Sequence, residues 1–587
     1  MGPFLRQKDH FAMKVHWLPT RLSLAARPGS TRALSDFWLL AWSISLSIGW
    51  LLPNHYPPWS TFHFDAWSAT AFCVLLLVLI VRVRDGVSWT GLSAIAAVLV
   101  PIPLIQYAAG VLVFAGNAWI STAYLLGFLL AVLAGARWAS SGTQAADGLF
   151  LAIGIASLLS VGLQLHQWFA LGLLDIWSMG DGFGRPFANF GQPNQLATFL
   201  LWGILAAAWG YVRGVLRGSV FVLYALFLLF GLSLTASRTA WVAIALLVIA
   251  TWCWRGLWPH RRAAWVVTLL AACFALCVLT GPWLSRLLTG QVLFDAGDIG
   301  RVSGESRQVI WTMFLDAALE RPLWGYGWNQ VSIAQMAVVI DHPSTLVFFS
   351  QSHNLFLDIA LWCGVPMAVF VFAVLATWFV RRVRAVQRAE DALLVLLLVV
   401  VGNHAMLEFP LHYAYMLLPT GVVMGLLETR LGVRTIVRSG RWVLVCLWLS
   451  ASVLLSLLVR DYMRVESSYQ VLRFEWARIK TEPAATPDVL LLTQWRDYFQ
   501  FVRLDPYQTM TNEQLVWMRH VVSIYPSPGF FQRLATALAV NNQPREAALW
   551  LRRLCKVNSA LQCAAVEAAW IEQGRGNALV RAVPWPR

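Results

Sequence analysis

Hydrophobic residues lie along this chain in long, nearly uninterrupted blocks that short polar segments separate. The blocks are about 17 to 25 residues long, the length that a helix needs to cross roughly 30 Å of hydrocarbon. About 13 blocks occur, centred near residues 45, 74, 98, 127, 156, 204, 228, 247, 275, 368, 400, 421 and 451. The pattern predicts an all-α, polytopic membrane protein with about 13 transmembrane helices.

The composition supports this fold class. Of the 587 residues, 58% are hydrophobic and 12% are charged, whereas soluble domains have about 25% charged residues. The first block follows a tail of more than thirty residues, lacks a small-residue cleavage site and is followed by further blocks, so we expect no cleavable signal peptide.

In the N-terminal tail and the loops between spans, positive charge is concentrated on one side of the expected topology. With the N-terminus in the cytoplasm, the inner tail and loops hold 22 of the 44 Lys and Arg residues, and 16 more follow from residue 460 onward. This is the positive-inside distribution, so the net charge of +15 indicates topology rather than nucleic-acid binding. The outer loops between spans hold only six: Arg185, Arg238, Arg286, Arg301, Arg307 and Arg321.

This topology divides the chain into five parts. They are a cytoplasmic tail (1–33), nine spans (34–285), a long outer loop (286–353), four spans (354–460) and an outer helical domain (461–587). Six of the eight cysteines fall inside apolar blocks, where a thiol usually behaves as a small hydrophobe. The other two, Cys555 and Cys563, lie in the outer domain, where a disulfide can form.

Two outer segments carry most of the polar chemistry. The first contains "GDGFGRPFANFGQPNQLAT", in which glycines and prolines exclude a regular helix and Asn189, Gln192 and Asn194 supply amide groups. Irregular backbone at membrane level must line a cavity or be covered by protein. The segment is therefore either a candidate site or a glycine-rich loop without chemistry.

The second segment contains "SGESRQVIWTMFLDAALERPLWGYGWNQ". An apolar stripe that includes Val309, Met313 and Leu319 predicts a helix over 306–319 on the outer membrane surface, and Pro322 ends it. Arg307 lies in the first turn, where the helix dipole disfavours a cation. It either pairs with Glu305 or faces an anionic ligand.

A third polar feature, Arg238 in "SLTASRTAW", lies at the outer face between two blocks and either snorkels to the interface or binds a ligand. Ionisable residues within the spans are nearly absent, and the exceptions, Asp358, His404 and Glu408, lie near outer ends. A coupled transporter usually needs such groups at the bilayer midplane. Polar groups at the outer rim instead favour an enzyme whose substrate is half lipid and half water-soluble.

Five segments in this order resemble the motifs of the O-antigen ligase and polymerase superfamily. They are "RPFANFGQPNQLAT", "LTASRTAW", "SRQVIWTMFLDAALERPLWGYGWNQ", "SHNLFLDIALWCGVP" and "NHAMLEFPLHYAYMLLP". The last, residues 403–419, resembles the branch of bacterial O-oligosaccharyltransferases that modify pilins. The resemblance covers residues 180–420 well and the remaining spans only by topology.

The resemblance implies a metal-independent glycosyltransferase of the GT-C type that needs no cofactor. Its donor would be an oligosaccharide on undecaprenyl diphosphate at the periplasmic leaflet of the inner membrane, and its acceptor a hydroxyl. His353 matches the essential histidine of the family, and Arg238 and Arg307 match its diphosphate-binding arginines, with Arg185 in the same role. We expect the groups that position the substrates to be Asn189, Gln192, Asn194, Asn354, His404 and Glu408.

Elementary chemistry agrees with these roles. A hydroxyl becomes a good nucleophile when its proton is removed, and histidine is the usual general base at neutral pH. Arginines can stabilise a leaving diphosphate without losing their own charge. The alternative for His353 is that it only caps a helix.

The outer domain contains "FFQRLATALAVNNQPREAALWLRRLCKVNS", which resembles one helix-turn-helix of a tetratricopeptide repeat. Since one repeat cannot form a solenoid, we expect a small TPR-like helical domain that docks the acceptor or covers the site. Two alternatives remain for the whole protein, an O-antigen ligase that joins glycan to lipid A-core and a flippase for lipid-linked oligosaccharides. A flippase predicts a charged central cavity between two related halves, which this sequence lacks.

Overall fold

The computed structural model describes residues 30–83, 85–140, 146–180, 185–290, 296–479, 482–483 and 485–586, and in 30–36 and 296–306 it describes the backbone only. Most of the predicted cytoplasmic tail, residues 1–29, therefore lies outside the described residues. So do Gly182 and Gly184 of the first outer segment.

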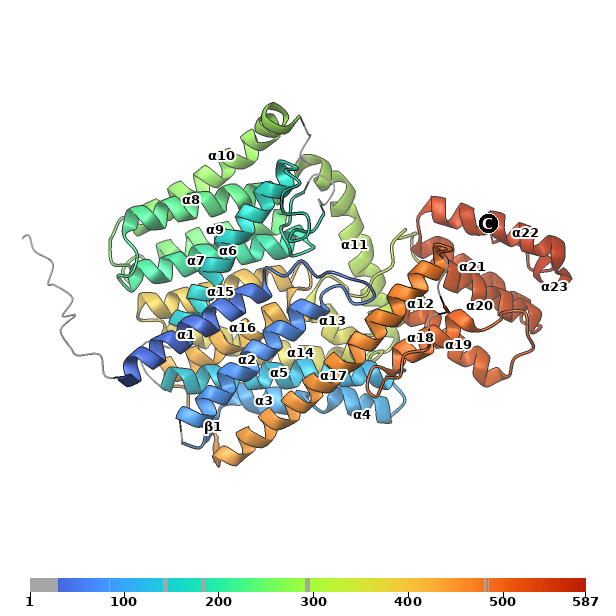
Figure 1. The fold of residues 1–587 in the computed structure, drawn as a ribbon, viewed down its shortest axis with the longest axis horizontal. Helices are drawn as coiled ribbons and strands as arrows, with labels where there is room; N and C mark the ends of the chain where they lie inside the picture. The colour runs from blue at the N-terminus through green and yellow to red at the C-terminus, as the bar shows by residue number, and fades with distance from the viewer. Residues whose placement is uncertain are drawn as a thin grey trace, which may run out of the picture. The chain divides into compact units, whose positions relative to one another are not determined.

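The described chain is almost entirely helical (Figure 1). The helices of the first half are α1 Ser30–Gly49, α2 Phe62–Arg82, α3 Gly91–Leu99, α4 Ile102–Ala108, α5 Ala115–Ser140, α6 Asp147–Trp168, α7 Pro193–Val212, α8 Gly218–Leu234, α9 Arg238–Cys253 and α10 Ala263–Thr289. Next come α11 Ala296–Glu320, α12 Val331–Val338, α13 Leu355–Cys363, α14 Val365–Ala385, α15 Ala389–Ala405, the short 3₁₀ helix η1 Pro410–His412, α16 Ala414–Arg430 and α17 Arg441–Trp476. The C-terminal helices are α18 Thr493–Arg503, α19 Asn512–Ile524, α20 Pro528–Val540, α21 Pro544–Val557, α22 Ala560–Gly576 and α23 Ala578–Arg581.

Each of the 13 predicted block centres falls inside a helix. Over the described residues, eight segments are helical, long and apolar enough to cross a membrane, and three shorter apolar helices accompany them. Length and composition thus support a polytopic membrane protein, with eight spans meeting the full criterion where we expected about 13. The sequence did not predict the antiparallel pair of β1 Val87–Trp89 and β2 Val437–Ser439, in which Ser88 faces Arg438.

Helices α5 and α16 approach each other unusually closely. On α5 and α16, Gly135 and Gly425 lie so near the facing backbone that an added Cβ would come within 2.0 Å of the carbonyl oxygens of Val422 and Val132. Small residues allow such close packing of membrane helices. The contact holds α16 firmly, and α16 follows directly after Glu408 and η1.

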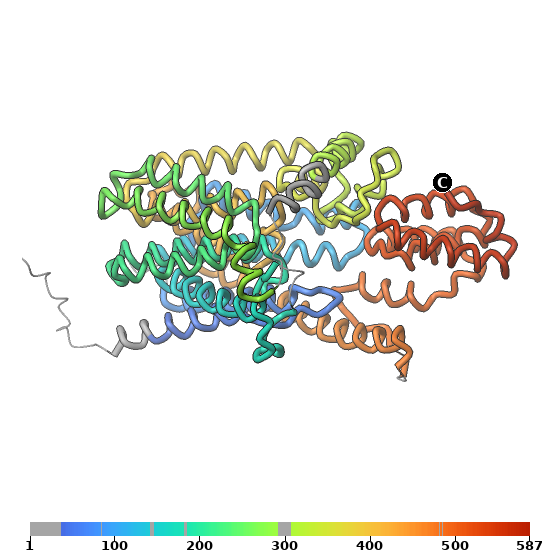
Figure 2. The backbone as a smooth tube through the Cα atoms, turned by 90° about the horizontal axis from the view of Figure 1, so that it is seen from above, coloured from blue at the N-terminus to red at the C-terminus, as the bar shows by residue number. Residues whose placement is uncertain are grey.

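The part of the protein next to the C-terminal helices has its own hydrophobic core. It joins the buried face of α11 (Met313, Phe314) to α13, to the C-terminal half of α17 and to the C-terminal helices. Helices α18–α23, orange to red in Figures 1 and 2, contact the bundle through α12 and α5. The catalytic candidate His353 lies in the loop between α12 and α13, within this part of the protein.

Three details differ from the sequence predictions. Helix α11, predicted over 306–319, begins earlier, at Ala296. Leu319 was predicted on its apolar stripe but is 60% exposed, whereas Ala317 is buried. The buried stripe packs against α12 and α13. The expected boundary at 460/461 falls inside α17, whose 36 residues extend about 54 Å at 1.5 Å per residue, well beyond the hydrocarbon core.

The C-terminal region contains the helix pair expected from its sequence. Helices α20 and α21 pack against each other across a short turn at Asn541–Gln543. Cys555 and Cys563 form a disulfide that closes the turn between α21 and α22, with their Cα atoms 5.0 Å apart. Residues Trp42–Arg587 form one compact unit.

Candidate active site

The loop that carries His353 is held from several sides. The buried carboxylate of Asp358 accepts hydrogen bonds from the backbone N–H and the hydroxyl of Ser352, both at 2.7 Å. The indole of Trp311 on α11 donates to the Ser352 carbonyl at 3.1 Å. His353 itself has φ of 58°, a left-handed conformation that is unfavourable for a residue with a β-carbon. Such strain persists where the surroundings impose it, typically at functional sites.

Asn354, not His353, caps the following helix. Its side-chain oxygen accepts a hydrogen bond from the Leu357 N–H at 3.2 Å, and its amide donates to the Met406 carbonyl at 3.2 Å. The alternative that His353 serves as the helix cap is therefore wrong. Asn354 ties the start of α13 to the segment that leads to Glu408.

The imidazole of His353 is directly bonded to Glu408. Its Nδ1 lies 2.7 Å from Glu408 Oε2, and since an ionised carboxylate only accepts hydrogen bonds, Nδ1 carries the proton and donates. In the neutral ring this leaves the lone pair on Nε2. The side chain of His353 is 24% exposed and that of Glu408 is 8% exposed, so the pair is shielded but reachable. The ring also contacts Phe349 and Phe409 edge-on.

Arg307 reaches the same carboxylate. Its Nη2 donates to Glu408 Oε1 at 2.8 Å, so Glu408 is the partner of Arg307 in this structure. The side chain of Glu305, the partner considered from the sequence, lies outside the described residues. A guanidinium has five N–H donors, so one bond to Glu408 leaves others for an anionic ligand.

Glu408 is stabilised as an anion. Burial raises its pKa, but the hydrogen bond from His353 and the charges of His353, Arg307 and His404 together outweigh burial, so the pKa of Glu408 lies below its usual value. A carboxylate hydrogen-bonded to an imidazole fixes the ring orientation and favours protonation of the other nitrogen. This geometry makes His353 Nε2 a proton acceptor.

Arg185 and Arg238 complete a cationic surface beside Glu408. Arg185 donates from Nε and Nη2 to the Thr235 carbonyl at 3.0 and 2.9 Å, which ties the first outer segment to the turn before Arg238. Burial lowers the pKa of Arg185, the Glu408 carboxylate opposes this change and the Arg238 cation adds to it. Arg238 in turn repels Arg307 and attracts Glu408. All three predicted diphosphate ligands therefore interact electrostatically with the Glu408 carboxylate, and Arg307 also bonds to it directly.

The predicted positioning residues fall into two groups. Asn189 is 1% exposed, and its side chain bonds to the backbone of Leu51, Trp177 and Met179. Gln192 caps α7 by accepting from the Gln195 N–H at 2.8 Å. Both side chains organise the first outer segment in this structure, and a role for them toward substrate stays a prediction.

Asn194 and His404 lie next to Glu408. The amide of Asn194 points to Glu408 Oε1 at 3.4 Å. His404 is fully buried, its Nδ1 lies 2.7 Å from the Thr198 hydroxyl, and its carbonyl accepts the Glu408 N–H at 2.8 Å. Both residues therefore act on the position of Glu408.

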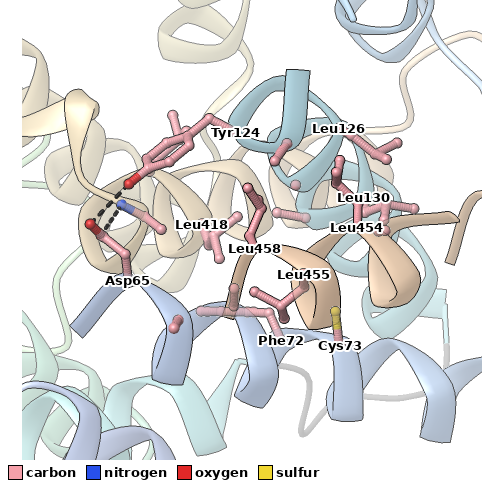
Figure 3. A pocket seen from close by; sticks show the side chains of 18 of the residues that line it. Asp65, Phe72, Cys73, Tyr124, Leu126, Leu130, Leu418, Leu454, Leu455 and Leu458 are labelled. Atoms are coloured by element: carbon pink, nitrogen blue, oxygen red, sulfur yellow. Dashed lines mark hydrogen bonds between the residues drawn. The ribbon is translucent and has the colours of Figure 1, made fainter. Parts of the chain in front are cut away.

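A second carboxylate anchors the segment after Glu408. Asp65 on α2 accepts hydrogen bonds from the Tyr124 hydroxyl at 2.9 Å, from the Thr61 hydroxyl at 3.0 Å and from the Ala414 N–H at 2.6 Å. Figure 3 shows Asp65 and Tyr124 at one end of a cavity of about 100 Å³ that is otherwise lined mainly by apolar side chains. Asp65 thus fixes the start of α16 and the short η1 turn that follows Glu408.

The C-terminal domain bonds to the N-terminal part of the loop that carries His353. The Lys556 carbonyl accepts hydrogen bonds from the N–H groups of Thr345 and Leu346, each at 3.0 Å, and the Lys556 ammonium donates to the His342 carbonyl at 2.6 Å. Lys556 follows Cys555, so the disulfide closes the turn that makes these contacts.

Sequence reasoning missed several of these partners. Asp358 and Trp311, which hold Ser352, were not assigned a role, and Glu408 was expected to contact substrate rather than His353. The only signal was that Asp358 is one of the few carboxylates within the apolar blocks. Across the described parts of the chain, no cluster of three or more His, Cys, Asp or Glu is arranged to hold a metal ion.

Three families match parts of this chain. "Protein glycosylation ligase" matches residues 186–209, "O-Antigen ligase" matches residues 223–372, and "Virulence factor membrane-bound polymerase, C-terminal" matches residues 392–569. The O-antigen ligase region contains Arg238, Arg307 and His353, and the polymerase region contains Glu408. The residues that meet in the site thus come from all the matched parts of the chain.

Two proteins of Acinetobacter baylyi are similar to this chain. A general O-oligosaccharyltransferase is 30% identical over 545 residues, which cover 89% of this chain and 93% of that relative. A ComP-specific O-oligosaccharyltransferase is 27% identical over 251 residues, 42% of this chain and 44% of that relative's length.

Proposed function

The chain belongs to the O-oligosaccharyltransferase family and is a glycosyltransferase, and from this premise we propose that it transfers an oligosaccharide from undecaprenyl diphosphate to a serine or threonine hydroxyl of a protein. The acceptor is a pilin or another periplasmic protein. The enzyme lies in the inner membrane with its N-terminus in the cytoplasm and its active site on the periplasmic side.

The observation that carries this proposal is the His353–Glu408 pair, with Nδ1 and Oε2 2.7 Å apart. In the reaction, Nε2 of His353 takes the proton of the acceptor hydroxyl while the hydroxyl oxygen forms a bond to the anomeric carbon of the first sugar. The bond from that carbon to the phosphate oxygen breaks, and undecaprenyl diphosphate leaves with the electron pair. Glu408 orients the ring and stabilises the imidazolium that forms.

Arg185, Arg238 and Arg307 bind the diphosphate. Charge develops on the leaving oxygen as the bond breaks, and cations placed there in advance stabilise it without reorganisation. Guanidinium groups suit this task because they can bind phosphate oxygens bidentately and stay charged. Three arginines in one site supply this stabilisation without a metal ion.

The position of the site fits a reaction between a lipid and a water-soluble molecule. His353 precedes α13 at the end of the bundle from which the C-terminal domain extends. A donor carried in the membrane and an acceptor in the periplasm meet only at such a rim. The Cys555–Cys563 disulfide supports an outer location of that domain, because disulfides persist mainly outside the cytoplasm.

Co-expression with a candidate pilin and a lipid-linked glycan tests the proposal, with the mass of the pilin as the readout. We expect a mass increase equal to one glycan on the pilin, and none with His353→Ala, whose protein level must match wild type. If glycan instead appears on lipid A-core and never on protein, the enzyme is an O-antigen ligase. No transfer to either acceptor would refute the proposed reaction.

A further inference from the structure

A large cavity lies within the helical bundle, away from the site. Its volume is about 690 Å³, within the roughly 300–1,000 Å³ typical of small-molecule sites. Helices α7, α8, α9, α10 and α15, labelled in Figure 1, form its walls. The deep end is apolar and buried, with Leu205, Leu229, Ile244, Leu247 and Leu396.

The cavity opens at the end of these helices that is opposite the active site. Helices α7 and α9 begin beside the site, at Pro193 and Arg238, and run about 24–30 Å at 1.5 Å per residue to the connections where the mouth lies. The mouth is formed by the ring of Tyr211 and the exposed side chains of His260, Arg261 and Arg262.

The two arginines at the mouth are free to bind a ligand. In the described part of the chain, neither the Arg261 nor the Arg262 guanidinium makes a hydrogen bond or an ion pair. By contrast Arg213, at the same end of the bundle, pairs with Asp147 at 3.4 Å. An apolar, buried interior and a cationic, exposed mouth match the two halves of an anionic amphiphile.

We propose that this cavity binds an anionic glycerophospholipid, with an acyl chain among the buried leucines and its phosphate at Arg261 and Arg262. The polyprenyl chain of the donor is a poorer match, because its diphosphate belongs at Arg238, at the other end of the same helices. A chain in the cavity fills the space between α7, α9 and α15. These helices carry Asn194, Arg238 and His404, so the bound lipid stabilises the packing of the helices that position the site.

The test measures lipid binding to the purified full-length protein in detergent by native mass spectrometry. The probes are phosphatidylglycerol and phosphatidylethanolamine with identical acyl chains. Three proteins are compared with wild type: Arg261→Gln/Arg262→Gln at the mouth, Ala271→Phe inside the cavity, and Arg217→Gln/Arg255→Gln as a control. The control removes two exposed arginines near the same end of the bundle that do not line the cavity.

We expect wild type and the control to prefer phosphatidylglycerol by about tenfold, because both lipids carry a phosphate but only phosphatidylethanolamine places a positively charged ammonium beside the two guanidinium groups. The Arg261→Gln/Arg262→Gln protein should lose this preference, and Ala271→Phe should bind both lipids more weakly. Equal binding of the two lipids by wild type, or a preference that survives in Arg261→Gln/Arg262→Gln, would overturn the proposal. If Ala271→Phe does not fold, the arginine comparison alone decides.

Discussion

Replacing Glu408 by Gln should slow glycan transfer while leaving the protein folded. The change keeps the shape of the side chain and removes its negative charge. It converts two charge-assisted hydrogen bonds, from His353 at 2.7 Å and from Arg307 at 2.8 Å, into bonds to a neutral amide. The amide oxygen can take the place of only one carboxylate oxygen, so it accepts from either His353 or Arg307. The amide nitrogen, itself a donor, then faces the other donor.

The size of the effect follows from these contacts. A hydrogen bond to a charged group contributes about 1.5–3 kcal/mol, and a tenfold change in rate corresponds to about 1.36 kcal/mol. If the bond to His353 is needed only in the transition state, its loss lowers kcat roughly 10- to 150-fold. Glu466→Gln is the matched control, because Glu466 forms the same kind of pair with His63 at 3.2 Å outside the site and should leave kcat unchanged.

The effect of Glu408 should persist across the physiological pH range. Because its folded-state pKa is lowered, the contribution of anionic Glu408 is present above the usual glutamate value near about 4.3 and is lost only as the pH falls through the lowered pKa. Glu408 therefore stays charged between pH 5 and 8, and the ratio of the wild-type rate to the Glu408→Gln rate should be constant over that range.

The assay is single-turnover transfer from purified lipid-linked oligosaccharide to an acceptor protein, measured by intact mass from pH 5 to 8. A structural role would lower the amount of folded protein, whereas a role beside the base lowers kcat in protein that stays folded. A Glu408→Gln enzyme with wild-type kcat, or with a rate lowered only in proportion to its folded fraction, would refute the assignment of Glu408 as the partner of the base.

Three further predictions follow from the same structure. Arg238→Ala and Arg307→Ala should each cost about 2–4 kcal/mol of transition-state stabilisation, with partial rescue by Lys, and normal turnover of both Ala variants would make these arginines structural. Cys555→Ser/Cys563→Ser should destabilise the C-terminal domain by roughly 2–4 kcal/mol, measured by chemical denaturation, and should lower turnover in the transfer assay. An unchanged rate would mean that the disulfide-closed turn does not position the His353 loop. Asp341→Cys, in the exposed part of that loop, should react with a membrane-impermeant thiol reagent from the periplasm above the wild-type background, and labelling only from the cytoplasm would contradict the topology.

The helices could be predicted because each apolar block is a local signal. A run of about 20 hydrophobic residues forms a helix because its backbone polar groups can bond only to one another in hydrocarbon. Every predicted centre therefore falls in a helix. The boundary at 460/461 was placed by a change in composition. The backbone does not follow this change, because the polar residues after it also favour a helix, and α17 continues to Trp476. Leu319 shows the same limit, since periodicity alone does not say which residues of a stripe the neighbouring helices cover.

The site was predictable in its residue types but not in its contacts. Motif and outer-end position selected His353, Arg238 and Arg307, and the fold brings them around Glu408. The pairing of His353 with Glu408 joins residues 55 positions apart across the three helices α13, α14 and α15, and no spacing rule connects them. Asn189 was selected as an amide that could position substrate, yet in this structure its polar atoms bond to the backbone of its own segment and of Leu51.

The most direct test of the account is whether His353 accepts the proton of the acceptor hydroxyl. Purified wild-type enzyme and His353→Asn are compared in transfer of glycan from undecaprenyl diphosphate to an acceptor protein, with donor binding and melting temperature measured on the same samples. Asparagine can keep a hydrogen bond to Glu408 but cannot take a proton, so we predict about 10²–10⁴-fold slower transfer with donor binding and stability retained. A well-folded His353→Asn enzyme that transfers glycan at a near-normal rate would contradict the account.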